Sequence, residues 1–97
     1  MERLTNEIWK PVVGYEQFYE VSNMGNVRHR KNRRLRHLDF STNYPTIVLA
    51  ANGEHKRVRV HRLVAKAFLW PVFGKTDVNH INGDHTDNRV ENLEWVT

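Results

Sequence analysis

The dipeptide Asn52-Gly53 constrains the fold of this chain more than any other short segment. Both residues tolerate positive φ, which a two-residue turn between antiparallel strands requires. On either side lie segments rich in branched and aromatic residues, Tyr44–Ala51 and Lys56–Val60, and in the second of these valines alternate with arginines. The pattern therefore predicts a β-hairpin with one packed face and one cationic face that points to solvent or to a ligand.

The segments around this hairpin predict a small α+β fold. Residues 9–21 combine aromatic and branched residues with Pro and Gly, which favours a short packed segment over a helix, and the string SNMGN predicts a turn at residues 22–26. Two short basic strands, Val27–Arg30 and Leu35–Leu38, are expected around a turn at Asn32. In His61–Leu69 the apolar residues recur at helical spacing, which predicts a helix that ends before Pro71.

Positive charge is concentrated in the middle of the chain. Residues 28–66 hold eleven Lys or Arg and two acids, whereas the net charge of the whole chain is +4. This segregation favours a polyanionic partner such as DNA, because Lys and Arg displace counterions from phosphates. The alternative is a solvated basic surface. The residues expected to contact DNA are Arg28, Arg30, Lys31, Arg33, Arg34, Arg36, Arg57, Arg59 and Arg62.

The composition excludes several classes of protein. The chain has no cysteine, so it forms no disulfide, and we expect no structural zinc site. No apolar run approaches the roughly 18 residues that a membrane-spanning helix needs. The opening string MERLTNEIW lacks the basic start and apolar stretch of a secretory signal. We therefore expect a soluble, cytoplasmic protein of one small domain.

The last segment combines two candidate strands, 77–81 and 93–96, with a loop rich in Asn and Asp. Its first strand carries His80, and a histidine with a reference pKa of about 6.5 can serve as a general base at pH 7. Neighbouring amide and carboxylate oxygens suit a hard cation such as Mg²⁺ or Mn²⁺. On these residues alone, a catalytic site and a packed histidine beside an Asn-rich turn are both open interpretations.

Three strings in the chain resemble parts of one nuclease family. VNHINGD, continued by DNRVENLEWVT, is similar to the first part of the HNH endonuclease motif of phage and intron-associated (homing-type) nucleases. HRLVAKAF is similar to the helix that precedes this motif, and EIWKPVVGYEQFYEVSNMGNVR resembles a modular DNA-binding motif that accompanies such nucleases. Together these strings cover nearly the whole chain in the expected order.

The resemblance implies a fold and a role for three residues. It implies a small basic antiparallel β-sheet module that binds DNA at residues 1–60, then one helix and the ββ part of a ββα-metal fold at residues 61–97, in one compact unit. His80 would act as the general base toward water, and Asn79 would bind Mg²⁺ or Mn²⁺. Asn92 would be structural and orient the site by holding the strand that carries His80.

In this family a helix follows the second strand and carries the last His or Asn of the motif, a metal ligand. The sequence stops at Thr97, so we expect a motif truncated before its last helix, either in a fragment or by natural truncation. Two hypotheses follow, a divalent-metal-dependent endonuclease of double-stranded DNA from a phage or mobile element in a bacterial host, and a nuclease-derived DNA-binding protein without cleavage activity. A third is an adaptor that binds an acidic protein and has no affinity for DNA.

Further aromatic and histidine residues are expected to be structural. We expect His61 to bond the backbone, His85 to face solvent, and Trp95 to pack beneath the site. The aromatic residues expected in the core of the N-terminal module are Tyr15, Phe18 and Tyr19.

Overall fold

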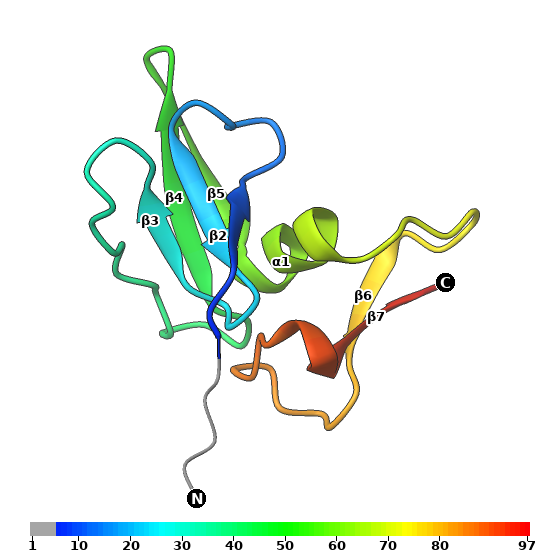
Figure 1. The fold of residues 1–97 in the computed structure, drawn as a ribbon. Coiled ribbons are helices and arrows are strands. Elements are labelled where there is room, and N and C mark those ends of the chain that lie inside the picture. The colour runs from blue at the N-terminus through cyan, green and yellow to red at the C-terminus, as the bar shows by residue number, and fades with distance from the viewer. Residues whose placement is uncertain (1–5) are drawn as a thin grey trace, which may run out of the picture.

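The computed structural model describes residues 6–97, so residues 1–5 of the predicted β region and of the opening string lie outside it. Within this range the strands form three separate antiparallel sheets, and one α-helix runs between them (Figure 1). The α+β class is confirmed. The basic module that we expected as a single sheet consists of two small sheets whose edges share no hydrogen-bonded strand pair in the described range.

The first sheet is a meander of β1 (Trp9–Pro11), β2 (Tyr19–Ser22) and β3 (Val27–His29). The predicted turn at residues 22–26 joins β2 to β3 and is closed by the Ser22 N–H donating to the Asn26 carbonyl at 2.8 Å. Tyr19 is buried in the core, but Phe18 is 39% exposed, so its assignment to the core was wrong. Phe18 lies in the turn that precedes β2, where its N–H donates to the Tyr15 carbonyl, and Tyr19 is the first residue of the strand.

The predicted strand Leu35–Leu38 does not form. Leu35 makes an isolated bridge to Arg28, and the segment has no further strand pairing within the described residues. The preceding turn is tight, with Arg33 at φ +59° and the Asn32 Oδ1 accepting a hydrogen bond from the Arg34 N–H. Leu35 emerges from it 66% exposed, and within the segment Leu38 is the residue that packs against the core.

The second sheet is the predicted hairpin of β4 (Thr46–Ala51) and β5 (Glu54–Arg59). Asn52 and Gly53 both have positive φ, at +54° and +81°, as the turn requires. The hairpin is thereby confirmed, with one shift at its end. Val60, expected to end the second strand, is buried and begins the helix instead.

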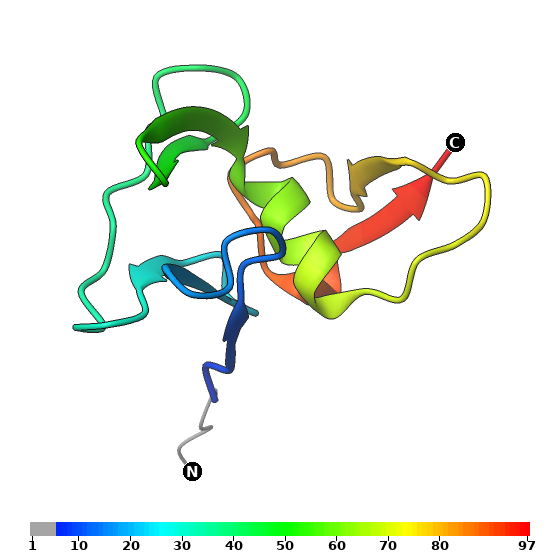
Figure 2. The same cartoon turned by 90° about the horizontal axis from the view of Figure 1, so that it is seen from above.

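The helix α1 (Val60–Phe68) is the common packing surface of the fold. It contacts β1 and β2 of the first sheet, β5 of the second and both strands of the C-terminal hairpin, and Figure 2 shows it between these sheets. Its apolar residues recur at helical spacing, which is why a helix of nine residues can pack against all three sheets. The buried hydrophobic core comprises Val12, Tyr19, Val21, Val27, Ile47, Leu49, Val60, Leu63, Val64 and Leu93.

The third sheet is the hairpin of β6 (Asp77–His80) and β7 (Leu93–Val96), with the short 3₁₀ turn η1 (Val90–Asn92) just before β7. Its register pairs His80 with Leu93 and Asn79 with Glu94. Trp95 packs half-buried in β7 opposite Val78, and its buried indole N–H has no hydrogen-bond partner among residues 6–97. No helix in residues 6–97 is long and apolar enough to cross a membrane.

Candidate functional site

His80 lies at the end of β6 with its side chain turned into the protein and only 5% of the residue exposed. Its Nε2 lies 2.7 Å from the Asn88 Oδ1. Because a carbonyl oxygen only accepts, this contact is a hydrogen bond in the tautomer that carries its proton on Nε2 and a lone pair on Nδ1. Among residues 6–97, Nδ1 has no hydrogen-bond partner. It is also not one of the side-chain atoms that are both unpaired and fully buried, so it reaches solvent. A general base needs such an open nitrogen.

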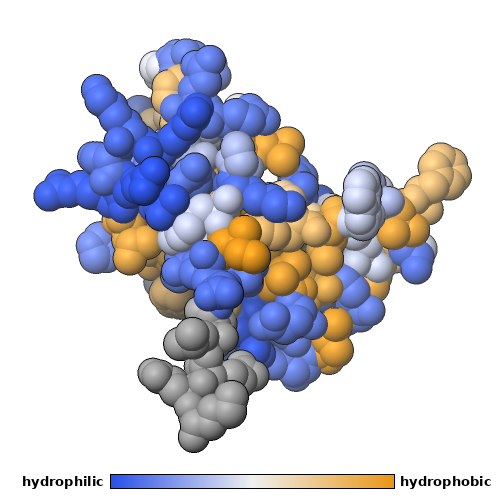
Figure 3. Space-filling view, viewed as in Figure 1, coloured by the Kyte–Doolittle hydropathy of each residue, from blue (hydrophilic) through white to orange (hydrophobic). Residues whose placement is uncertain are grey.

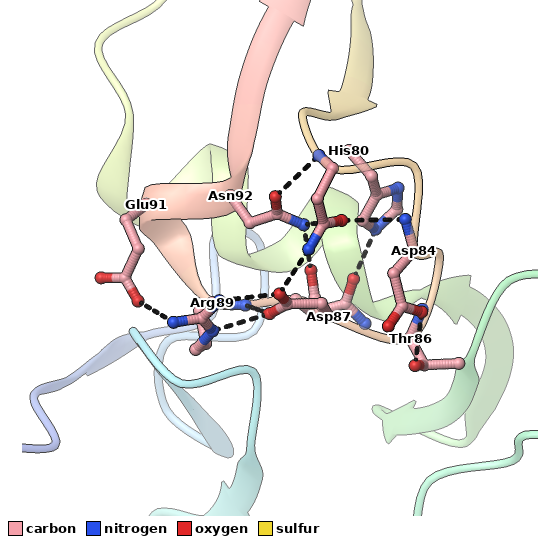
Figure 4. A network of polar contacts seen from close by, with 9 residues as sticks. His80, Asp84, Thr86, Asp87, Arg89, Glu91 and Asn92 are labelled. Atoms are coloured by element: carbon pink, nitrogen blue, oxygen red, sulfur yellow. Dashed lines mark hydrogen bonds and ion pairs between the residues drawn. The ribbon is translucent and has the colours of Figure 1, made fainter.

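Asn92 braces the loop that joins β6 to β7, as Figure 4 shows. Its Oδ1 accepts a hydrogen bond from the Asn82 N–H at 3.0 Å, and its Nδ2 donates to the Asn82 Oδ1 at 3.0 Å and to the Asp87 carbonyl at 2.9 Å. The Ile81 N–H also donates to the Asn92 carbonyl. These bonds tie the residues directly after His80 to the start of β7.

The two aspartates of this loop are engaged within it. The Arg89 guanidinium donates to Asp87 at 2.8 Å, and this bond, with a second from Asn82, lowers the pKa of Asp87 to about 2. Hydrogen bonds from the Thr86 hydroxyl and N–H likewise lower the pKa of Asp84. Both carboxylates therefore hold the loop in shape, in the manner of turn residues.

Asn79 precedes His80 at the end of β6, where Asn79 is exposed and His80 is buried. Asn79 is exposed, and its Nδ2 donates to the Glu94 Oε2 on β7 at 2.8 Å. An amide oxygen and a carboxylate thus lie side by side, and both are hard ligands. Sequence reasoning missed Glu94, although the hairpin register pairs it with Asn79. In residues 6–97 there is no group of three or more His, Asp or Glu that could hold a metal ion.

A stack of aromatic rings surrounds His80 on its inner side. The Tyr44 ring lies between His61 and His85, with centroid distances of 5.0 and 4.2 Å, and the His61 ring is 4.9 Å from His80. His85 is half-buried and bonded to Asn43 through Nδ1, so the expectation that it faces solvent was wrong. The stack holds it because its ring covers Tyr44.

His61 also differs from expectation. Its Nδ1 is buried with no partner among the described residues, where we expected a bond to the backbone. Burial, reinforced by the positive potential of His80, Arg62 and Arg59, lowers the pKa of His61 to about 4. The ring is therefore neutral at pH 7 and serves as packing surface beneath the site.

Five of the nine predicted DNA-contacting residues bind acceptors of the protein itself. Arg28 forms an ion pair with Glu20 at 2.8 Å and lies over the Trp9 ring, while Arg36 donates to the Val48 carbonyl at 3.0 Å. The other three with acceptors are Arg30 (the Glu16 carbonyl), Arg57 (Asp39 and Thr46) and Arg62 (the Thr76 carbonyl). Long-range pairing of this kind is invisible in a linear charge count.

The other four of the nine predicted residues bind no acceptor within the described part of the chain. Lys31, Arg33 and Arg34 project from the turn after β3 and are here named the β3 loop, and Arg59 lies at the end of β5 over the Tyr44 ring. Beside the β3 loop is an open hollow of about 540 Å³ lined by His29, Arg34, Leu35, Arg36 and His37. Strongly hydrophilic residues gather over the β3 side of the molecule in Figure 3.

A histidine pinned at the end of a short hairpin, an asparagine bracing the loop behind it, and a cationic β surface nearby together define a small nuclease-type domain. Comparison with known families identifies which one. Residues 58–97 match the HNH endonuclease family and residues 7–50 match the NUMOD4 motif. The two matches follow one another along the chain, so the chain is similar to the HNH homing endonucleases over both segments, as the resemblance predicted.

Relatives of known sequence and structure agree with this assignment. The chain is 41% identical over 97 residues to the uncharacterized HNH endonuclease L247 of Acanthamoeba polyphaga mimivirus, covering 95% of this chain and 24% of that protein. It is 39% identical over 90 residues to the DNA endonuclease I-HmuI of Bacillus phage SP01, covering 92% and 52%. The solved structure of I-HmuI superposes with a TM-score of 0.82 at 37% identity, over 93% of this chain and 52% of that one. The chain thus spans about half the length of I-HmuI and 24% of the length of L247.

Proposed function

We propose that this chain hydrolyses phosphodiester bonds in double-stranded DNA as a divalent-metal-dependent HNH endonuclease. The observation that carries the proposal is the state of His80, whose Nε2 is held by Asn88 while Nδ1 is open to solvent. Similarity to I-HmuI, whose structure was solved for DNA binding and cleavage, supports DNA as the substrate.

In this proposal, His80 Nδ1 accepts a proton from the attacking water. A bond forms between the water oxygen and phosphorus, and the bond from phosphorus to the 3′ oxygen breaks, with a proton from solvent completing the leaving group. Asn92 keeps His80 in place by closing the loop behind it. The role of His80 depends on a neutral ring at the pH of reaction.

The proposed metal is Mg²⁺ or Mn²⁺, and Asn79 and Glu94 are the residues that would hold it. Two oxygen ligands from the protein suit Mg²⁺, which keeps several waters and takes further oxygens from substrate phosphates. When bound, the ion would neutralise charge on the scissile phosphate and stabilise the leaving oxygen. Loss of ion binding in Glu94→Gln, measured by calorimetry with Mn²⁺ alone, would support this placement, and unchanged binding would refute it.

We propose that the β3 loop and Arg59 hold the DNA backbone. They are the predicted cations that no acceptor of the described residues neutralises, and exposed Arg and Lys are well suited to phosphates. The five cations with internal partners would shape this surface rather than bind tightly. The relative from Bacillus phage SP01 favours a phage or mobile-element origin, with action in the cytoplasm of a bacterial host.

A supercoiled-plasmid nicking assay tests the proposal. The chain is incubated with Mg²⁺ or Mn²⁺, with EDTA, and as the variants His80→Ala and His55→Ala, the latter an exposed histidine of β5 outside the site. We expect nicking that EDTA and His80→Ala abolish and His55→Ala preserves. DNA binding in a gel shift without nicking would overturn the nuclease in favour of a nuclease-derived DNA-binding protein. Absence of both activities would overturn DNA as the partner.

A further inference from the structure

Asn88 controls the ring of His80 more directly than any other side chain of the described residues. It lies in the loop between β6 and β7, is 5% exposed, and places its Oδ1 2.7 Å from the His80 Nε2. Asn92 and Asn82, the neighbouring loop asparagines, bond to each other instead. Of these three asparagines, Asn88 is therefore the one whose side chain contacts the His80 ring and determines which ring nitrogen carries the proton.

Asn88 in turn packs against the N-terminal motif, which is far away in the sequence. Gly25 approaches it so closely that a Cβ added at Gly25 would lie 2.9 Å from the Asn88 Cβ and 3.2 Å from the Asn88 carbonyl oxygen. Two residues further along, the Val90 N–H donates to the Asn23 carbonyl at 2.9 Å. The turn at residues 22–26 thus contacts the catalytic loop through both a close packing contact and a backbone hydrogen bond.

This turn is well suited to act as a rigid support for Asn88. Ser22 is fully buried, and its Oγ accepts hydrogen bonds from the Met24 and Asn26 N–H groups, each at 3.1 Å. The Gly25 N–H donates to the Ser22 carbonyl, which closes the turn further. Because these bonds are local, the turn holds its shape independently of the loop that rests on it.

We propose that Asn88 is a positioning residue that fixes the His80 tautomer with Nδ1 free, and that the turn at residues 22–26 of the NUMOD4 motif holds Asn88 in position. The N-terminal motif would then complete the active site in addition to contacting DNA. This inference rests on the proposed role of His80 as the base. It assigns to Gly25 a packing function that any side chain would disrupt.

The tautomer can be measured without any enzymatic assay, by NMR of the chain labelled with ¹⁵N-histidine. Spectra are recorded at pH 9, where an ordinary imidazole with a pKa of about 6.5 is neutral, and the His80 signals are assigned by their loss in His80→Ala. We expect a proton on Nε2 in the wild type, a mixture of tautomers in Asn88→Ala, and recovery in Asn88→Asp, which retains an acceptor oxygen. A wild-type ring protonated on Nδ1, or an unchanged Asn88→Ala, would overturn the inference.

The role of the turn at residues 22–26 in holding Asn88 is tested with a matched pair of glycines in the same motif. Gly25 and Gly14 both have φ +89°, so alanine meets the same unfavourable φ at each, but nothing lies within 4 Å of a Cβ at Gly14. Thermal unfolding confirms that both variants are folded. We expect Gly25→Ala to mix the His80 tautomers and to slow nicking about 10- to 100-fold, as displacement of a reacting group does, and Gly14→Ala to do neither.

Equal effects of the two alanine substitutions on the tautomer would overturn the proposal that the turn at residues 22–26 holds Asn88 in position. The outcomes also separate this inference from the proposed function. If the tautomers behave as expected but the wild type does not nick DNA, the nuclease proposal fails and the positioning role stands. If the wild type nicks DNA and neither Asn88→Ala nor Gly25→Ala alters the tautomer, the positioning role fails and the nuclease stands.

Discussion

Replacing Asn92 by alanine should destabilise the chain well beyond the average effect of a surface substitution. The change removes three hydrogen bonds, to the Asn82 N–H, the Asn82 Oδ1 and the Asp87 carbonyl, from a residue that is 6% exposed. At about 1 kcal/mol for each bond, and more where a buried partner is left unpaired, the expected loss is about 2–4 kcal/mol. For a domain of this size, each kcal/mol lowers the melting temperature by about 4–8 °C.

Urea unfolding followed by tryptophan fluorescence measures this loss, with Asn79→Ala as the matched control. Asn79 lies in the same hairpin but is exposed, and its side chain makes one hydrogen bond within the described residues, to Glu94, so its loss should stay within about 0.5 kcal/mol. Asn92→Asp should be no better than Asn92→Ala at pH 7, because its carboxylate would face two acceptor oxygens. A loss under about 1 kcal/mol, or one equal to the control, would refute the bracing role of Asn92.

Three further predictions follow from the charges of the site. Because the pKa of His61 is lowered to about 4, the unfolded chain binds this proton more readily, and stability should fall as the pH is lowered from about 6.5 to 4. Urea unfolding at several pH values should show a flatter profile in His61→Phe. Neutralising the three cations of the β3 loop should reduce the slope of log affinity for DNA against log salt by up to about 2.7, whereas Arg57→Ala, which removes a residue paired with Asp39, should change it little. Arg89→Met should raise the pKa of Asp87 from about 2 toward its ordinary value of 3.8 in a carboxyl NMR titration, and an unchanged value would contradict the pairing.

The elements that were predicted correctly are those specified by local chemistry. Asn52-Gly53 forms its turn because both residues accept positive φ, and the helix of α1 follows from apolar spacing within nine residues. Leu35–Leu38 had strand character too, but a strand also needs a partner and a surface to cover, and those come from elsewhere in the chain.

The same distinction applies to the site. His80, Asn79 and Asn92 were identified through short motifs, and the structure shows how each is bonded. Asn88 could be named only as one of several loop asparagines, because its contact with Gly25 joins residues more than sixty positions apart. The partners of Arg28 and Arg36 were missed for the same reason, since a charge count does not show which cations are already bonded.

The helix α1 has a consequence for how the chain opens. No sheet of the described residues has more than three strands, and each is too small to be stable when isolated, so all three depend on contact with this one helix. Opening α1 would release the three sheets together. The slowest-exchanging amides of β2, β4 and β7 should therefore share a single opening free energy in hydrogen–deuterium exchange, equal to that of global unfolding. The β3 loop surface and the hairpin that carries His80 would then be lost in one cooperative step.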